Sequence, residues 1–415
     1  MSTRRKCQFD NTSGSDVKLA DPSFCPVLGI MVSLLGPDGS PETDVEVCMK
    51  RVAVGVIAGC VMAAAFLQAQ ATTPFKLGTF ERAGRTFVGI VLRESTVIDF
   101  PAAHAAIRNP ASSVAAPADM KDLIVRYNSG LRARILDVIR TVETAKNKPA
   151  YVYELSAVKI MPPIMYPQTM LNVAVNYAEH DSEMAALRSS VAGLGTGTSG
   201  AALAGTVSMP GIWERPANER RWNPYMFVKL PSVVIAEGEA IRLPPGRTNV
   251  DWECELGVVI SKQATRVPVE QAADYIFGYT VENDVSDRGG RGDTRYGSDW
   301  FVSKNHETFA PMGPFITPKE FVADTQKLGV KFALNGQVIQ EGNTSLMIHN
   351  VLEQVMYATN ITTLRTGDVI STGTPAGVGS ARKPPIFFKG GDRSACTYEG
   401  IGTLTNPVVG STATN

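Results

Sequence analysis

Residues 251–260, which read D-W-E-C-E-L-G-V-V-I, place the strongest constraint on how this chain folds. Side chains of a β-strand alternate between its two faces, so Glu253 and Glu255 share one face. The other face then carries only apolar side chains, namely Trp252, Cys254, Leu256, Val258 and Ile260. Two buried neighbouring carboxylates repel each other and lose hydration, and a bound divalent cation removes both penalties. The pattern predicts a buried, cation-binding strand; the alternative is an amphipathic strand whose glutamates face water.

A third carboxylate follows another expected strand. Residues 276–282 are mostly apolar, and Asp284 follows them after one residue, in the run E-N-D-V-S-D-R. Carboxylate oxygens are the ligands that hard cations prefer. We therefore expect Mg²⁺ as the cofactor, with Mn²⁺ or Ca²⁺ as alternatives.

His180 and Glu183 form a candidate acid–base pair in the segment N-Y-A-E-H-D-S-E. If a helix begins here, the two side chains lie one turn apart on the same face. A carboxylate beside an imidazole orients the ring and raises its basicity, as a general base requires. The alternative interpretation is an ordinary surface ion pair.

Two further segments carry polar groups in apolar or glycine-rich surroundings. Lys304 precedes the run F-A-P-M-G-P, although a lysine in a loop usually faces solvent. Residues 367–379 read G-D-V-I-S-T-G-T-P-A-G-V-G, which is typical of a strand that runs into a glycine-rich loop. Such a loop is either a tight turn or a pocket that binds an anion through main-chain N–H groups.

In this order, the segments resemble the fumarylacetoacetate hydrolase superfamily over about residues 171–408. The family's successive motifs are N-Y-x-x-H-x-x-E, E-x-E, N-D-x-S-x-R, a lysine and T-G-T-P-x-G-V-G. They correspond here to residues 176–183, 253–255, 283–288, Lys304 and 372–379.

The resemblance implies a role for each candidate residue. It implies metal ligands Glu253, Glu255 and Asp284, a water-activating pair His180 and Glu183 on a lid, and substrate contacts Arg288, Lys304 and Thr374. The implied reaction is metal-dependent hydrolysis of a C–C bond in a small 2,4-diketo acid, either an acylpyruvate or a sugar-derived diketo acid. The alternatives are β-keto-acid decarboxylation or keto–enol isomerisation at the same site, and a non-catalytic exported binding protein. The family resemblance also implies a homodimer.

The expected fold class is α+β and β-rich. The resemblance places the family's mixed, sandwich-like β-roll in residues 167–415, behind a smaller N-terminal domain at 72–166. Apolar residues at helical spacing predict a helix over about 120–146. Prolines 162, 163 and 167 mark the expected boundary between the two domains.

A processing segment is expected at residues 49–71. A basic start, M-K-R, precedes the apolar run V-A-V-G-V-I-A-G-C-V-M-A-A-A-F-L and then A-Q-A, the three parts of a secretory signal peptide. Cleavage near Ala71 would remove the apolar segment. The mature protein would then have no stable membrane span, and it would be exported to the periplasm. If the segment is instead a buried helix, the protein is cytoplasmic. We expect residues 1–48 to be a disordered or wrongly assigned extension.

The amino-acid composition limits the classes of binding partner that we expect. Lysine plus arginine and aspartate plus glutamate number 40 each, which gives no reason to expect nucleic acid as a partner. The expected partner is instead a small keto or diketo acid. The six cysteines show no C-x-x-C spacing, which argues against a zinc knuckle. After cleavage only Cys254 and Cys396 remain, and in an oxidising compartment they are candidates for a disulfide.

Overall fold

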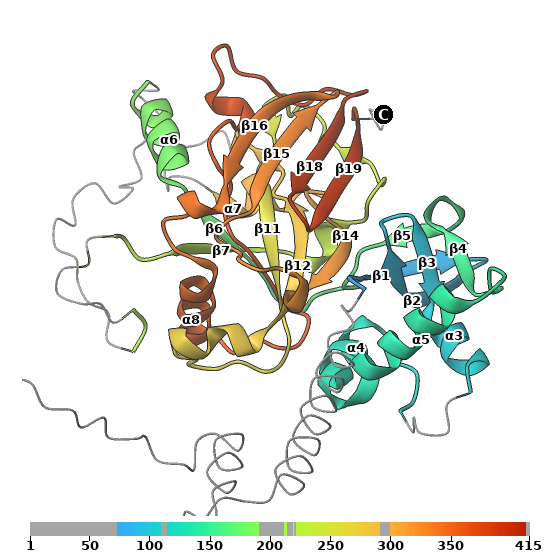
Figure 1. The fold of residues 1–415 in the computed structure, drawn as a ribbon. Coiled ribbons are helices and arrows are strands. Elements are labelled where there is room, and N and C mark those ends of the chain that lie inside the picture. The colour runs from blue at the N-terminus through green and yellow to red at the C-terminus, as the bar shows by residue number, and fades with distance from the viewer. Residues whose placement is uncertain are drawn as a thin grey trace, which may run out of the picture. The chain divides into compact units, whose positions relative to one another are not determined.

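The computed structural model describes residues 73–108, 114–190, 211–213, 219, 221–290 and 299–411 (Figure 1). The predicted extension 1–48 and the predicted signal peptide 49–71 lie outside these residues, so both stay predictions. Thr73–Asn415 form one compact unit, and the expected boundary between residues 166 and 167 within it also stays a prediction. Among the described helices, none combines the length and the apolar character needed to cross a membrane.

A mixed sheet of 12 strands is the largest element of this unit (Figure 1). Its main path runs in the order β4 (Val152–Glu154), β3 (Thr96–Asp99), β2 (Arg85–Leu92), β1 (Lys76–Arg82), β14 (Ala310–Pro318), β12 (Ile276–Asn283), β11 (Cys254–Ile260), β17 (Val369–Ser371), β6 (Met170–Ala174) and β7 (Tyr225–Lys229). Two shorter strands join beside this path, β5 (Lys159–Met161) on β1 and β8 (Val234–Ile235) on β14. Because β1 pairs with β14, strands from both expected domains belong to one sheet.

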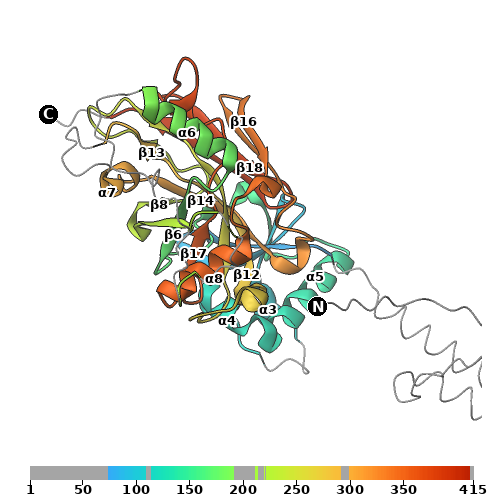
Figure 2. The ribbon, with the colours of Figure 1, turned by 90° about the vertical axis from the view of Figure 1, so that its left-hand side faces the viewer.

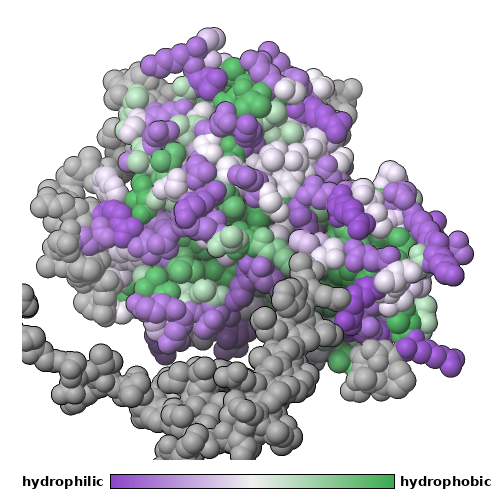
Figure 3. Space-filling model, in the orientation of Figure 1, coloured by the Kyte–Doolittle hydropathy of each residue, from purple (hydrophilic) through white to green (hydrophobic). Residues whose placement is uncertain are grey.

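A second sheet packs on the apolar face of β11. Its five strands run in the order β16 (Gln337–Asn343), β15 (Gly329–Leu334), β18 (Arg393–Tyr398), β19 (Gly402–Val409) and β9 (Ile241–Arg242). The Trp252 ring stacks on Phe332 of β15 with ring centroids 4.9 Å apart, and Cys254 and Leu256 lie in the same buried cluster. On the face drawn in Figure 3, hydrophilic and hydrophobic side chains are mixed over the described surface. The predicted β-rich α+β class is confirmed.

The predicted helix over 120–146 is confirmed, but it is interrupted. It forms α4 (Met120–Arg126) and α5 (Arg132–Thr144), joined by a π-helical segment at Tyr127–Leu131. Gly130 in this segment has a φ of +111°, which favours glycine and allows the chain to kink. The remaining α-helices among the described residues are α3 (Phe100–Ala106), α6 (Ala178–Ser190), α7 (Trp300–Lys304) and α8 (Val351–Ile361). Figure 2 looks onto the side that carries α6 and α8.

The expected continuous strand over 250–260 is wrong in one detail that matters for the site. β10 (Val250–Asp251) pairs with β13 (Ser286–Asp287), whereas β11 begins at Cys254 and pairs with β12. Glu253 lies between the two strands. Its N–H donates to Asn283 Oδ1 at 3.2 Å, and its carbonyl oxygen accepts from the N–H of Asp284 at 2.8 Å. These two hydrogen bonds fix the main chain at the point where its strand partner changes from β13 to β12.

His349 connects the end of β6 to the segment before α8. Its N–H donates to Asn176 Oδ1, and its carbonyl oxygen accepts from Asn176 Nδ2, at 2.9 and 3.0 Å. The side chain is buried against the Trp213 ring, with ring centroids 5.2 Å apart. Burial, together with the charge of Arg221, lowers the pKa of this imidazole to about 4.

Acid should therefore destabilise the fold through His349. The folded pKa of about 4 lies below the ordinary value of 6.5, so the unfolded chain binds the proton more tightly. The contribution to stability is complete above pH 6.5 and is lost as the pH falls towards 4, by about 3 kcal/mol in total. Urea unfolding between pH 7.5 and pH 4 measures this loss, and His349→Gln should reduce the slope. An unchanged slope in that variant would contradict the assignment.

Candidate active site

The structure brings Glu253, Glu255 and Asp284 together at one end of the β11–β12 pair. One carboxylate oxygen of each lies within 4.8 Å of those of the other two. The alternative in which the glutamates face water is wrong, because Glu253 is 7% and Glu255 1% exposed. Asp284 reaches the cluster because it directly follows β12. These three side chains can therefore act as one ligand set.

Two further buried carboxyl groups belong to the same region. Glu282 lies opposite Glu255 in the β11–β12 ladder, and its Oε2 accepts from Asn172 Nδ2 at 3.0 Å and Ser371 Oγ at 2.8 Å. Asp251, the last residue of β10, is also fully buried. Neither residue was predicted from the sequence to belong to the site. The apolar run I-F-G-Y-T-V that precedes Glu282 was the available signal.

Lys304, the last residue of α7, places its ammonium group inside the carboxylate cluster. Its Nζ donates to Glu253 Oε2 at 2.7 Å, to Asp284 Oδ2 at 2.6 Å and to Ser286 Oγ at 2.7 Å. The alternative of a solvent-facing lysine is wrong, since the residue is 2% exposed. Its three N–H bonds all have protein partners, so the implied contact with substrate stays a prediction.

Two more cations hold the carboxylates in place. The Arg288 guanidinium donates from Nε to Asp251 Oδ1 and from Nη2 to Glu253 Oε1, both at 2.7 Å. Its implied contact with substrate therefore also stays a prediction. Lys229, at the end of β7, is fully buried and donates to Asp284 and to two main-chain carbonyl groups. Lys229 was not predicted from the sequence, and the available signal was a lone lysine in the mostly apolar run Y-M-F-V-K-L.

The electrostatic environment differs sharply between the carboxyl groups. Burial by itself would raise the pKa of Glu253, but the neighbouring lysine and arginine outweigh it and lower the pKa below its usual value. For Glu255, burial and repulsion by nearby carboxylates, Asp284 first among them, raise the pKa. Burial likewise raises the pKa of Glu282 to about 8. The positive charge near Glu255 and Glu282 is therefore too small to offset the cost of ionising these two buried carboxyl groups.

The charges in this cluster do not balance. Five buried carboxyl groups take part, namely Asp251, Glu253, Glu255, Glu282 and Asp284. Within the part of the chain that the structure describes, three cationic groups contact them, namely Lys229, Arg288 and Lys304. With every group ionised, two negative charges remain, and unpaired buried charge is strongly destabilising. A divalent cation would neutralise them, and the oxygen donors of the ligand set suit Mg²⁺, Mn²⁺ or Ca²⁺.

His180 and Glu183 lie on α6, one turn apart as predicted. His180 Nδ1 is 3.1 Å from Glu183 Oε2, and its Nε2 is 3.9 Å from Glu253 Oε1. The imidazole is buried, so this is no ordinary surface ion pair. Both Glu183 oxygens accept from the N–H of Gly377, at 3.1 and 3.2 Å. Gly377 has a φ of +108°, a conformation that favours glycine.

The glycine-rich loop after β17 binds carboxylates of the protein itself. The N–H of Gly373 donates to Glu255 Oε2 at 3.0 Å, and that of Ser380 to Asp251 Oδ2 at 2.7 Å. Thr374 Oγ1 donates to the carbonyl oxygen of Cys254 at 3.1 Å and accepts from Gln340 Nε2 at 2.7 Å. The loop therefore does bind anions through its amides, whereas the implied contact of Thr374 with substrate stays a prediction.

Comparison with known proteins identifies the family. The sequence profile described as "Fumarylacetoacetate (FAA) hydrolase C-terminal" matches residues 169–409, more than half of the chain. The chain belongs to the fumarylacetoacetate hydrolase family. The resemblance inferred from the motifs is confirmed, and the matched range contains every predicted site residue.

Named relatives in this family are enzymes. An oxaloacetate tautomerase of Xenopus laevis, described as mitochondrial, is 31% identical over 271 residues, which cover 65% of this chain and 75% of that protein. A solved 5-carboxymethyl-2-hydroxymuconate delta-isomerase from Mycobacterium smegmatis is 27% identical, with a TM-score of 0.53 and coverage of 81% and 99%. Maleylpyruvate hydrolase from Sphingobium is 25% identical, with a TM-score of 0.57 and coverage of 81% and 100%. Another structure of that hydrolase, 24% identical to this chain, is described as a complex with manganese(II) and pyruvate.

Binding of a divalent cation should depend on Glu255 and on pH. Because the Glu255 pKa is raised, a proton must leave before the carboxylate can act as a ligand, and affinity should increase as the pH rises. Calorimetric titration of chelator-treated protein with Mn²⁺ from pH 6 to pH 8.5 measures this. Glu255→Gln should weaken binding at least about tenfold, whereas Glu341→Gln, an exposed site on β16, serves as the control. Equal affinity in the two variants would contradict the ligand set.

Proposed function

We propose that this protein is a divalent-cation-dependent hydrolase that cleaves a C–C bond in a small 2,4-diketo acid, either an acylpyruvate or a sugar-derived diketo acid. The observation that carries the proposal is the pair formed by the buried His180 and the half-buried Glu183, in which the imidazole Nε2 lies 3.9 Å from Glu253 Oε1. Activation of water requires a general base beside the site where the substrate is held. The relationship to maleylpyruvate hydrolase supports the same reaction class.

Glu253, Glu255 and Asp284 would hold the cation, which we expect to be Mg²⁺, with Mn²⁺ or Ca²⁺ as alternatives. Bound there, it would supply positive charge that orients the substrate's carboxylate and adjacent keto oxygen and stabilises negative charge on that oxygen. The manganese(II) and pyruvate in the maleylpyruvate hydrolase complex support a cation and a keto acid as ligands of this fold.

His180 would begin the reaction by taking a proton from water at Nε2. Glu183 would accept a hydrogen bond from Nδ1–H and stabilise the imidazolium that forms. The water oxygen bonds to the distal keto carbon, and the bond between that carbon and the neighbouring CH₂ group breaks. Its electron pair passes to a pyruvate-like enolate, whose carbon takes up the proton that His180 removed from water. Lys304 would stabilise the negative charge of the enolate, and the products are two carboxylic acids.

Keto–enol tautomerisation of a small keto diacid is the second candidate, and sequence relatives favour it. Oxaloacetate tautomerases of Xenopus laevis and Bos taurus are 31% and 34% identical to this chain. In that reaction His180 would move a proton between carbon and oxygen, and no water would be consumed. β-Keto-acid decarboxylation needs the same binding groups but releases carbon dioxide.

Product analysis separates these candidates. Chelator-treated protein given Mg²⁺ or Mn²⁺ is mixed with acylpyruvates, diketo sugar acids and oxaloacetate, and loss of the enol ultraviolet absorbance is followed. Formation of two acids would support hydrolysis. A single isomeric product would support tautomerisation, and release of carbon dioxide would support decarboxylation. Tight binding without turnover of any member would instead support an exported binding protein.

Replacing His180 should abolish the reaction and leave cation binding in place. His180→Ala removes the proposed base, so we expect kcat to fall at least about 100-fold, with the Mn²⁺ affinity nearly unchanged. His104→Gln, in α3 of the N-terminal part, is the matched control and should keep full activity. Undiminished turnover of His180→Ala would exclude the assigned role.

We also propose export through residues 49–71, with cleavage near Ala71 and a periplasmic destination, because the basic, apolar and small-residue parts occur in the required order. Mass spectrometry of protein recovered from the producing cells should give Thr72 as the first residue. A chain that keeps residues 49–71 would contradict export and support a cytoplasmic location. The homodimer implied by the family is a further proposal, which light scattering tests.

A further inference from the structure

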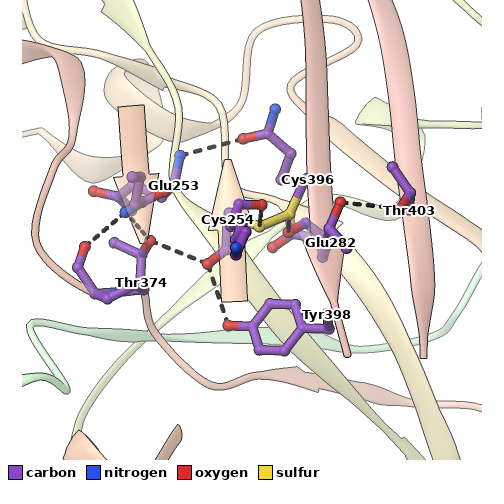
Figure 4. Close-up of a disulfide and its surroundings, with 12 residues drawn as sticks. Glu253, Cys254, Glu282, Thr374, Cys396, Tyr398 and Thr403 are labelled. Carbon is purple, nitrogen blue, oxygen red and sulfur yellow. Dashed lines mark hydrogen bonds between the residues drawn. A yellow bond between two sulfur atoms is a disulfide. The ribbon is translucent and has the colours of Figure 1, made fainter. Parts of the chain in front are cut away.

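A disulfide joins the cation-binding strand to the second sheet. Cys254, the first residue of β11, lies between Glu253 and Glu255 in the sequence, and it is bonded to Cys396 in the middle of β18 (Figure 4). The two residues are separated by 142 positions, and their Cα atoms are 5.5 Å apart. Both are fully buried. The bond therefore crosses the interface between the two sheets directly behind the ligand set.

Cys254 is held at its main chain as well as at its sulfur. Its carbonyl oxygen accepts from Tyr398 Oη at 3.3 Å and from Thr374 Oγ1 at 3.1 Å, as Figure 4 shows. Tyr398 follows Cys396 by two positions on β18, so both side chains leave the same face of that strand. β18 thus holds the residue between the two glutamates by a covalent bond and a hydrogen bond.

The disulfide also touches β12, the strand that leads directly to the third carboxylate. Cys396 Sγ lies 3.7 Å from the carbonyl oxygen of Glu282, which stands opposite Glu255 and two positions before Asp284. A movement of β18 away from β11 would therefore alter the contacts that hold β11 and β12 in place. Cation ligands must sit within a few tenths of an ångström of their required positions, so a small displacement of the strand is enough to weaken binding.

We propose that the Cys254–Cys396 disulfide is a positioning element of the cation site, which holds Glu253 and Glu255 in the arrangement that binds a divalent cation tightly. Reduction transfers two electrons and two protons to the two sulfur atoms, and a dithiol reductant is converted to its own disulfide. The covalent tie between β11 and β18 is then lost, and the hydrogen bond from Tyr398 Oη to the Cys254 carbonyl oxygen remains. The inference rests on the proposed cation site, and it is independent of which reaction the site performs.

The test measures Mn²⁺ affinity of the full chain by calorimetry before and after reduction, with the reductant removed under nitrogen. Peptide mapping under non-reducing conditions verifies the Cys254–Cys396 bond in each sample. We expect reduction, and the variant Cys396→Ser, to weaken Mn²⁺ binding about tenfold or more, and reoxidation of the wild type to restore it. A variant with Cys7, Cys25, Cys48 and Cys60 all changed to serine keeps the disulfide and should retain the full response.

The outcomes distinguish a positioning role of the disulfide from a merely structural one. A disulfide with a merely structural role would lower the melting temperature on reduction and leave the Mn²⁺ affinity unchanged, which would overturn the inference. Loss of the response in the fourfold cysteine variant would overturn it too. If Cys396→Ser does not fold, the Mn²⁺ affinity of the wild type before reduction, after reduction and after reoxidation provides the test. Absence of Mn²⁺ binding in either state would overturn both this inference and the proposed cation site, whereas redox-dependent binding without hydrolysis would support the inference and reject only the reaction.

Discussion

Excess buried negative charge at the end of the β11–β12 pair is the constraint on which the rest of the structure depends. The cations that offset it come from separate elements: Lys229 from β7, Arg288 from the residue after β13 and Lys304 from α7. The loop after β17 adds main-chain amides to Glu255 and Asp251. Leaving one such carboxylate unpaired costs several kcal/mol, so the same charges that form the site also fix the elements around it.

Local rules predicted the part of the site that is local in sequence. Strand alternation placed Glu253 and Glu255 on one face, and helical spacing placed His180 beside Glu183. Lys229 escaped prediction because its partner Asp284 is 55 residues away, and their contact depends on the sheet order, which periodicity does not specify. The motif order identified the family and thereby supplied the long-range information. It could not show that the polar groups of Arg288 and Thr374 would contact the protein's own carboxyl and carbonyl groups.

Hydrolysis and tautomerisation share an early requirement, which is stabilisation of negative charge on a keto acid oxygen. They differ in what the base acts on: water in the first, a carbon-bound proton in the second. His180 is placed for either task, with one ring nitrogen towards Glu183 and the other towards the carboxylate cluster. The family contains both kinds of enzyme on one scaffold, so the shape of the substrate and the access of water, more than the ligand set, must decide the outcome.

The pairing of β1 with β14 has a consequence for protein stability in solution. Leu77 of β1 lies opposite Ile316, on the side of β14 that faces away from β12. A fragment limited to the family-matched residues 169–409 would lack β1 and leave main-chain N–H and C=O groups of β14 without partners. Unpaired strand edges recruit strands from other molecules and start aggregation. The N-terminal strands thus protect the edge of β14, and shortening the chain to its family-matched segment would expose an edge that promotes self-association.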